Sequence, residues 1–495
     1  MDGLSRRRVL KSGLAAIGAL TAAAHQTSAS TTQPAAPAQA GGRFDTVIVG
    51  AGCAGLACAV EAHDRGGRPV ILEKMSRPAG NAIYALGGIS AVGTRYQRDQ
   101  GIVDTPDKFY ADLMAVSLQR GDPVLNRLYA EKIAESTHWL ADVVGVKFLK
   151  IVIAPHPRLG RTHFVDGEGI TGGGMLIRKL LQAARQRDIP ILFNTKAVEL
   201  LTDSRMRVTG VRALTEAGMQ DFPAAGGVVI ASGGYSANAE MVTKYIGGWA
   251  ARLALRGSPV VTGENISLTM PVYAKLVNMD QFHAGPIVAD THVNPAELVD
   301  SGIGVIVSLQ GTRIIDESAT YVAKAKQLPQ LTRENRALQI VDSGSDLLRL
   351  IVDKYEEFNS PFYKADTIGD LAAACGLPVE ATVRTVDQFN KALKDGALRQ
   401  LVPPNTVKAP RPIARPPFYA FPFEGGMTAT FGGPKINARA EVLNLEGQPI
   451  PGLYAAGNAA GGLFFDDYIA GTQLGAATVF GRIAAEQTVA RAKKG

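Results

Sequence analysis

The sequence contains few cysteines, and their number limits the chemistry that the chain can carry. Among its 495 residues only Cys53, Cys58 and Cys375 are cysteines. Three thiols cannot build a disulfide framework or a four-thiolate metal site, and none of them lies in a C-x-x-C-H haem-attachment motif. A covalently attached haem and a structural zinc site are therefore excluded, and we expect no metal site.

The sequence also lacks a concentration of charge of one sign. The formal net charge is +7, and the first forty residues contribute three of these charges through Arg6, Arg7, Arg8 and Lys11 against Asp2. The other lysines and arginines are interspersed with acidic residues. A nucleic-acid-binding protein needs a basic patch or stripe, so we expect no nucleic-acid partner.

The N-terminal segment resembles an export signal. Residues 5–11 read S-R-R-R-V-L-K and precede a weakly apolar run over residues 12–24. The twin-arginine pattern S-R-R-x-F-L-K is matched except that Val9 replaces Phe. The apolar run is shorter than the roughly 20 residues that cross a bilayer. We expect residues 1–40 to be a signal and spacer, and the mature protein to be periplasmic or secreted without a stable membrane span; a basic disordered tail is the alternative.

The remaining composition is that of a globular enzyme. Apolar residues make up 46% and charged residues 20% of the chain, and its length allows about three domains of roughly 150 residues. The 54 glycines exceed the average of about 7% without a collagen period. This excess favours tight turns and close approaches of the backbone to a ligand.

A dinucleotide-binding pattern opens the mature chain. A predicted strand at 44–49, a G-x-G-x-x-G motif, a predicted helix at 56–62 and a second strand at 69–72 follow one another. Gly50 permits the tight turn, Gly52 lets the backbone approach a pyrophosphate, and Gly55 allows helix and strand to pack closely. Glu73 ends the second strand and would accept hydrogen bonds from ribose hydroxyls. Cys53 and Cys58 are interpreted as packing residues.

Three further glycine-rich segments identify the nucleotide. They are the loop at 76–88, the strand and turn G-V-V-I-A-S-G-G-Y at 227–235, and the segment 452–471, which precedes a predicted helix at 476–485. On these motifs, residues 44–490 resemble the FAD-dependent fumarate reductase/succinate dehydrogenase flavoprotein superfamily, and its 3-ketosteroid dehydrogenase-like branch in particular. In that family the C-terminal segment covers the flavin ring, so the resemblance implies FAD and not NAD.

The resemblance also implies the architecture. We expect an α/β protein whose Rossmann-like FAD-binding domain (GR2 type), at 41–245 and 396–495, is interrupted by an α+β cap domain at 246–395. Helical patterns at 343–355 and 369–377 agree with this assignment. Residues 76–94 contain no His to attach the flavin, so FAD is expected to bind noncovalently. Electrons would pass to or from a separate partner, namely a quinone, a cytochrome or oxygen.

By the same resemblance, many residues are expected to contact FAD. The role of His163 stays open. The predicted cofactor-binding residues are Gly50, Gly52, Ala54, Gly55, Glu73, Lys74, Asn81, Gly87, Gly88, Gly173, Val198, Ser232, Gly233, Gly457, Asn458, Thr472 and Leu474.

The expected active site departs from that of the dicarboxylate reductases, which bind their substrate with two His and an Arg and protonate it with a second Arg. His283 matches a retained His, and Arg313 with Glu317 resembles a structural pair of the cap. Tyr321 replaces the proton-donating Arg and Tyr468 the substrate-binding Arg. The first residues of T-A-T-F-G-G at 428–433 replace both His of the family's H-H-T-M-G-G. A dianion needs fixed cations, so fumarate and succinate are disfavoured.

The two tyrosines match positions of the 3-ketosteroid dehydrogenases. The resemblance implies that Tyr321, with His283 beside it, removes a proton while Tyr468 holds the carbonyl oxygen, and that the hydride passes to flavin N5. The predicted activity is therefore α,β-dehydrogenation of a neutral, ketosteroid-like carbonyl compound. One alternative is an FAD-dependent reductase of an unsaturated organic acid, urocanate- or fumarate-like, which uses a separate electron donor and holds its anion with Arg256 or Arg415. Another is a noncatalytic flavin-binding or cofactor-delivery protein.

Overall fold

The computed structural model describes residues 43–151 and 160–494, and it divides the chain into two compact units. Unit 1 comprises the described residues of Met1–Met241, together with Gly257–Phe282 and Ala429–Gly495. Unit 2 comprises Val242–Arg256 and His283–Thr428. The predicted export segment, residues 1–40, lies outside the described residues.

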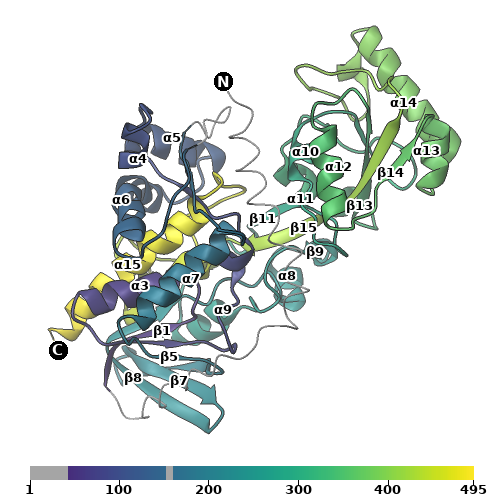
Figure 1. Cartoon of the computed structure of the whole chain (residues 1–495). Coiled ribbons are helices and arrows are strands. Elements are labelled where there is room, and N and C mark those ends of the chain that lie inside the picture. The colour runs from purple at the N-terminus through teal and green to yellow at the C-terminus, as the bar shows by residue number, and fades with distance from the viewer. Residues whose placement is uncertain (1–42, 152–159, 495) are drawn as a thin grey trace, which may run out of the picture. The chain divides into compact units, whose positions relative to one another are not determined.

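Unit 1 is built on a mostly parallel sheet (Figure 1). The described residues form eight strands in the order β17-β18-β8-β1-β2-β5, and β6 and β7 continue from β8. The strands are β1 (Phe44–Val49), β2 (Pro69–Leu72), β5 (Ile191–Leu192), β6 (Lys196–Thr202), β7 (Val208–Thr215), β8 (Gly218–Ile230), β17 (Glu441–Leu443) and β18 (Pro449–Ala455). Both β1 and β2 have their predicted bounds. They are short, mainly apolar runs, as a parallel strand covered on both faces requires.

Helices cover this sheet, and smaller strand pairs flank it. The helices of unit 1 are α3 (Cys53–Asp64), η2 (Asn81–Tyr84), α4 (Arg95–Arg98), α5 (Pro106–Val116), α6 (Pro123–Asp142), α7 (Gly172–Arg185), α9 (Glu264–Thr269), η4 (Met270–Val272), η6 (Gly457–Ala459) and α15 (Thr472–Ala492). The strand pairs are β3 (Gly88–Ser90) with β4 (Thr162–Phe164), and β10 (Leu276–Val277) with β16 (Gly433–Pro434). Helices α3, α7 and α15 run side by side along the sheet (Figure 1).

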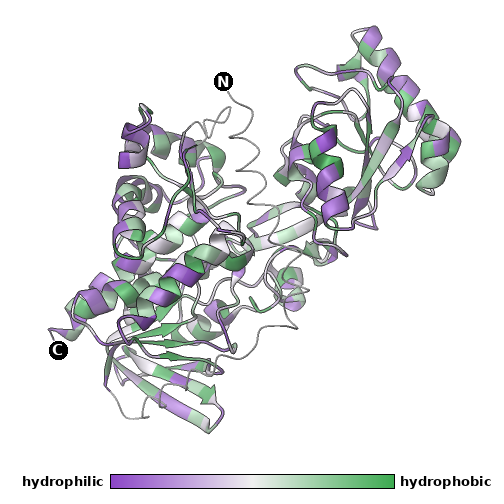
Figure 2. Ribbon diagram, in the orientation of Figure 1, coloured by the Kyte–Doolittle hydropathy of each residue, from purple (hydrophilic) through white to green (hydrophobic). Residues whose placement is uncertain are grey.

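The close contact between α3 and α15 depends on a small residue. A Cβ at Gly481 would lie 2.5 Å from the carbonyl oxygen of Ala54. In Figure 2 hydrophobic residues gather on the strands around β1, whereas hydrophilic residues occupy outer turns of the helices. The core of unit 1 therefore lies between the sheet and these helices. Both helices begin earlier than predicted, because their first turns consist of small and polar residues that carry little helical periodicity.

Unit 2 contains a second sheet with helices on both faces. Its order is β11-β15-β13-β12, and β14 and β9 also pair with β15. The strands are β9 (Ala254–Leu255), β11 (Phe282–Ile287), β12 (Val305–Val307), β13 (Arg336–Asp342), β14 (Tyr363–Ala365) and β15 (Phe418–Thr430), with the first residue of β11 and the last two of β15 assigned to unit 1. The helices are η3 (Ala250–Arg252), α10 (Ala296–Asp300), α11 (Tyr321–Leu331), α12 (Leu348–Glu357), α13 (Ile368–Ala374), α14 (Val379–Lys394) and η5 (Leu398–Gln400), while α8 (Ala239–Tyr245) starts in unit 1.

The alternation of side chains along β13 explains the two covered faces. Leu338 and Ile340 pack against α13 and α14. Their neighbour Ala337 packs with α10 and α11, and Val341 packs with α10 and α12. Successive side chains of a strand point to opposite faces, so one apolar strand supplies both halves of the core.

The unit boundaries differ from the expected cap at 246–395 in two places. Residues 396–428 belong to unit 2 because residues 418–424 of β15 pair along the whole of β13. Residues 257–282 belong to unit 1, where α9 packs against the Rossmann-like part through Glu264 and Asn265. These two boundaries depend on tertiary pairing, which the sequence pattern does not contain.

The two predicted helices of the cap exist with shifted ends. The first begins at Leu348 and not at Ser343, because the Asp342 carboxylate accepts hydrogen bonds from the N–H groups of Gly344 and Ala414 and so fixes a loop before the helix. The second is α13, which ends at Ala374. None of the described helices combines the length and the apolarity needed to cross a membrane.

Candidate active site

Four parallel strands of unit 1 end at one edge of the sheet. The register pairs Val49 of β1 with Leu72 of β2 and with Ile230 of β8, and Ile230 with Ala455 of β18. The three glycine turns and Glu73 follow these strand ends directly. Open α/β sheets bind nucleotides outside the carboxyl ends of their strands, so the fold gathers the predicted cofactor residues where a dinucleotide would bind.

The first glycine turn has the geometry that the motif predicts. Gly50 has a φ of +106°, and a Cβ there would lie 2.7 Å from the carbonyl oxygen of Ala231. A Cβ at Gly55 would lie 2.0 Å from the carbonyl oxygen of Gly50, so the helix can pack on the turn only with glycine there. At Gly52 the nearest atom would be 3.9 Å away, which leaves room for a ligand. Helix α3 starts after Gly52 without a side-chain cap, a terminus suited to a phosphate group.

Glu73 connects the end of β2 to the glycine turn. Its carboxylate accepts hydrogen bonds from the N–H groups of Ala51, at 2.8 Å, and Met75, at 2.9 Å. Burial raises the pKa of this carboxyl group despite these bonds. A carboxylate has about four acceptor sites, so Glu73 can hold the turn and still accept a ribose hydroxyl. The neighbouring Lys74 instead forms a 2.6 Å ion pair with Glu264.

Three buried polar atoms near these turns have no hydrogen-bond partner in the described part of the chain. They are Ser232 Oγ, Glu264 Oε2 and Gln473 Nε2. Leaving such atoms unsatisfied costs free energy, and a bound cofactor rich in hydroxyl, phosphate and ring heteroatoms can satisfy them. The residues present therefore fit FAD. Glu264 and Gln473 were not predicted, although the acid directly after Gly263 at a helix start was a readable signal.

Of the remaining predicted residues before β8, all but Val198 lie in the loop after β2 or against it. Asn81 accepts a 2.7 Å hydrogen bond from the N–H of Ser258, and Gly88 begins β3. A Cβ at Gly87 would lie 2.4 Å from the backbone of Gly172, and one at Gly173 would lie 2.0 Å from a carbonyl oxygen of η2. The backbones themselves thus require glycine here. Val198 is exposed and lies where a bulge interrupts the pairing of β6 with β7.

The predicted C-terminal residues meet the first motif. Gly457 has a φ of +66°, and a Cβ there would lie 3.0 Å from the Cβ of Ala54. Gly233, with a φ of +77°, occupies the turn after β8 beside Ser232. Asn458 donates a 3.3 Å hydrogen bond to Gln473. Thr472 and Leu474 lie in the first turn of α15, so the structure assembles the N- and C-terminal cofactor segments within one unit.

In unit 2 the structure brings His283 and Tyr321 together. His283 is the second residue of β11 and is 2% exposed, and Tyr321 is the first residue of α11. Tyr321 Oη lies 3.5 Å from His283 Nε2, and the two rings meet edge to face at a centroid distance of 6.1 Å. This is long for a hydrogen bond but allows exchange of a proton between the two side chains after a small movement.

Arg256 lies beside the same strand. Its N–H donates to the carbonyl of Met427, and its Nη1 donates to Thr428 Oγ1 at 2.8 Å. A Cβ at Gly285 would lie 2.8 Å from the guanidinium carbon of Arg256. Gly285 and His283 are two residues apart on β11 and so face the same side. Of the two arginines considered for an anion contact, Arg256 thus lies beside His283, whereas Arg415 is exposed.

Three buried charged groups of unit 2 have structural partners. Arg313 and Glu317 form a buried, two-pronged ion pair at 2.9 and 2.6 Å, which confirms their interpretation as a structural pair. Lys324 is buried and donates to the carbonyl oxygen of Glu317 at 2.6 Å and to that of Val299. Burial lowers the pKa of Lys324 to about 8.

Tyr468 belongs to unit 1, where it packs with two phenylalanines. The ring centroid of Phe431 lies 5.3 Å from that of Phe464 and 6.0 Å from that of Tyr468. The centroids of Phe464 and Tyr468 are 5.7 Å apart. The Tyr468 N–H donates to Asp467 Oδ1 at 2.8 Å. The sequence predicted a site role for Tyr468 but not the ring cluster around it.

Three residues with reactive side chains are accounted for by packing. Burial raises the pKa of Cys53 to about 11 and also that of Cys58. Both stay protonated at neutral pH, which agrees with a packing role. The buried His163 lies 2.7 Å from Thr94 Oγ1 and 2.7 Å from the carbonyl oxygen of Arg161. In the described ranges no three His, Cys, Asp or Glu residues are grouped as metal ligands.

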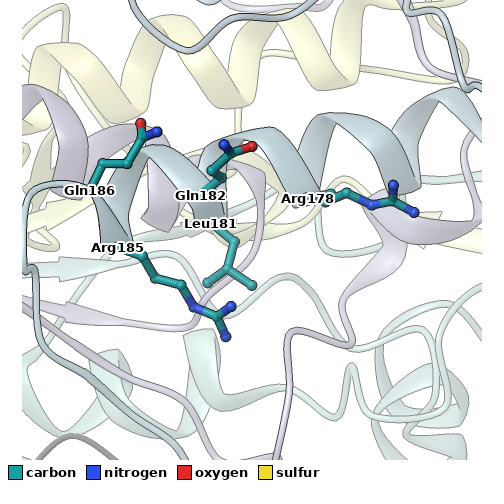
Figure 3. Close-up of a pocket in the computed structure, with 5 residues that line it drawn as sticks. All are labelled: Arg178, Leu181, Gln182, Arg185 and Gln186. Carbon is teal, nitrogen blue, oxygen red and sulfur yellow. The ribbon is translucent and has the colours of Figure 1, made fainter. Parts of the chain in front are cut away.

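A hollow of about 340 Å³ on the surface of α7 lies outside the predicted site. Figure 3 shows its lining residues along one helix. They are Arg178, Leu181, Gln182, Arg185 and Gln186. None of them was predicted as a site residue, so this hollow is not the candidate active site.

Comparisons with known proteins agree with an FAD-binding fold. The profile of the FAD binding domain family matches residues 45–466. NADH:fumarate oxidoreductase of Klebsiella pneumoniae is 32% identical over 91% of this chain, which spans only 48% of that protein. Urocanate reductase of Eggerthella lenta is 27% identical over 93% of this chain and 77% of that protein.

Two solved structures are similar over most of their length. The open conformation of a flavocytochrome c3 fumarate reductase superposes with a TM-score of 0.80 at 28% identity, covering 91% of this chain and 79% of that one. The 3-ketosteroid-Δ4-(5α)-dehydrogenase of Rhodococcus jostii has a TM-score of 0.72 at 25% identity, covering 92% and 98%. The predicted α/β FAD-binding fold is thereby confirmed.

Proposed function

The chain belongs to the FAD binding domain family, among the FAD-dependent oxidoreductases of the fumarate reductase/succinate dehydrogenase flavoprotein superfamily that act on CH–CH groups, and from this premise we propose that it reduces the C=C bond of an unsaturated organic acid. This was the alternative to the dehydrogenation predicted first. The named relatives that are reductases favour it over that prediction.

The observation that carries the proposal is the position of Arg256. Its guanidinium lies on the face of β11 that carries His283, and His283 in turn lies beside Tyr321. A guanidinium fork matches the geometry of a carboxylate. One cation of this kind suits a monocarboxylate, and the two arginines of the dicarboxylate reductases are replaced here by Tyr321 and Tyr468. The proposed substrate is therefore a monoacid with a conjugated double bond.

The residues of unit 2 supply binding and a proton. Arg256 binds the carboxylate and orients the double bond. When bound and reduced, FAD supplies a hydride to one carbon of that bond. Tyr321 delivers the proton to the other carbon, and His283 returns a proton to its phenolate oxygen. The net reaction consumes two electrons and two protons, and the electrons come from a separate donor protein.

Flavin absorbance provides the test. The holoprotein is reduced anaerobically with a limiting amount of dithionite and then mixed with acrylate, urocanate, cinnamate or fumarate. We expect a monoacid to reoxidise the flavin and to be converted to the saturated acid, with fumarate the poorest substrate. The proposal is overturned if no unsaturated acid reoxidises the flavin, or if fumarate is preferred.

A specific observation favours one second candidate, the α,β-dehydrogenation of a neutral carbonyl compound. Tyr321 and Tyr468 both occupy positions at which the dicarboxylate reductases carry arginine. The similar Rhodococcus jostii dehydrogenase was solved with a steroid ketone bound. In this case adding a ketosteroid to the oxidised holoprotein would bleach the flavin, and reduction of the unsaturated acids would not occur.

We also propose that the protein is exported through the twin-arginine pathway before it meets its electron donor. The proposal rests on the S-R-R-R-V-L-K sequence at 5–11. Replacing Arg6 and Arg7 by Lys is expected to retain the flavoprotein in the cytoplasm, as judged by cell fractionation. Unchanged export of this double variant would contradict it.

A further inference from the structure

Three aromatic rings of unit 1 form a compact cluster, here called the ring cluster, of Phe431, Phe464 and Tyr468. Phe431 meets Tyr468 edge to face at 88°, and Phe464 is tilted by 50° and 55° against the other two. Phe431 is buried, whereas Phe464 and Tyr468 are partly exposed. Two of the three rings therefore offer surface to a ligand.

The ring cluster lies beside both of the later cofactor turns. Phe464 lines a small cavity together with Gly457, Asn458 and Gln473, which follow β18. Phe431 follows Thr430, whose Oγ1 accepts a 3.0 Å hydrogen bond from the N–H of Tyr235 after the turn at Gly233. The cluster is thus located at the edge of the sheet to which the cofactor residues belong.

The segment 278–281 holds two of the rings in place. Asn278 Nδ2 donates to the carbonyl oxygen of Phe464 at 2.7 Å, and the N–H of Phe431 donates to the carbonyl oxygen of Gln281 at 2.8 Å. The Gln281 side chain accepts a 3.0 Å hydrogen bond from Asp466, which has a left-handed φ of +59°. Such a conformation is costly for a residue other than glycine and marks a loop shaped by its surroundings.

We propose that the ring cluster binds an aromatic or heteroaromatic ring of the substrate, so that the protein selects 3-arylpropenoic acids over small aliphatic acids. This inference deepens the proposed function and rests on it. Edge-to-face and offset packing favours planar rings, and a fumarate-sized acid has no group that would fill this surface. Tyr468 occupies the position of the substrate-binding Arg of the dicarboxylate reductases, so this replacement exchanges charge recognition for ring recognition.

The test compares two substrates that differ by one ring. With reduced methyl viologen as donor, kcat/KM of the holoprotein is measured for cinnamate and for acrylate. We expect cinnamate to be preferred by about tenfold or more, the scale of a well-formed apolar contact. Phe464→Leu should bring the ratio towards one, chiefly by lowering kcat/KM for cinnamate. Phe44→Leu, at the opposite end of β1, is the matched control and should leave the ratio unchanged.

Flavin content and thermal unfolding confirm that the variants are folded. The inference is overturned if acrylate is used as well as cinnamate, or if Phe464→Leu with full flavin content keeps the wild-type ratio. Failure of every unsaturated acid, urocanate included, to reoxidise the flavin would overturn the proposed function instead. Ring recognition is then judged from the perturbation of the flavin spectrum by 3-phenylpropanoate and by propanoate. Equal affinity for the two would overturn it, and tighter binding of 3-phenylpropanoate that Phe464→Leu abolishes would support it.

Discussion

The Arg256 guanidinium donates a 2.8 Å hydrogen bond to Thr428 Oγ1. Thr428, the acceptor of this hydrogen bond, occupies the position of the first His in the H-H-T-M-G-G motif of the dicarboxylate reductases. A neutral hydroxyl there holds an arginine that follows strand β9, outside the motif. Unit 2 thus has the Arg256 guanidinium at this position, although both His of the motif are absent.

Replacing Arg256 by Gln tests whether this cation binds the substrate. A hydrogen bond to a charged group contributes about 1.5–3 kcal/mol, so KM for an unsaturated acid is expected to rise by about 10- to 100-fold with a smaller effect on kcat. Arg256→Lys should be intermediate because it keeps the charge and loses the fork. The control is Arg415→Gln, at an exposed arginine of the same unit. Steady-state kinetics identical in wild type and Arg256→Gln would exclude the role.

Replacing Tyr321 by Phe removes the proposed proton donor and leaves the ring. General acid catalysis contributes about 10²- to 10⁴-fold, and kcat is expected to fall within this range while flavin content stays unchanged. Tyr419→Phe, at a partly buried phenol on β15, serves as the comparison. Retention of full kcat by Tyr321→Phe would show that another group supplies the proton.

Replacing Gly55 by Ala should abolish cofactor binding. The new Cβ would lie 2.0 Å from the carbonyl oxygen of Gly50, so the glycine turn or the start of α3 has to move. The ratio of flavin absorbance to protein absorbance in the purified variant measures the loss, which we expect to exceed tenfold. Gly66→Ala is the control, because Gly66 has a φ of +80° with open space around its Cβ position. Its strain of about 1–2 kcal/mol should lower stability without loss of FAD.

Lys324 makes stability depend on pH in a predictable direction. Burial lowers its pKa from 10.5 to about 8, so between these values the unfolded chain binds more protons than the folded one. The free energy of unfolding should therefore rise with pH across this window, by at most about 3 kcal/mol. Urea unfolding at several pH values from about 7.5 to 10 would show the rise. Lys324→Met should lose it, and a variant that keeps the full slope would assign the effect to other groups.

Local patterns were sufficient for the cofactor half of the fold. The strands at 44–49 and 69–72, the turn at Gly50 and the acid at Glu73 follow from glycine spacing and short apolar runs, which act over a few residues. The helix start at Cys53 was missed because the first turn carries little helical periodicity. The start at Leu348 was missed because a hydrogen-bonded loop precedes that helix. The unit boundaries were displaced because long strands such as β15 obtain their partners from distant parts of the chain.

The amino-acid sequence alone determined that this is an FAD-binding oxidoreductase, since the glycine motifs that identify it are contiguous. Only the tertiary structure decided that Arg256 and not Arg415 lies beside His283, that His283 and Tyr321 meet, and that Phe431, Phe464 and Tyr468 form one surface. The physical reason is that all but one of these contacts join residues 27 to 38 positions apart, through strand register and packing, which no local spacing encodes.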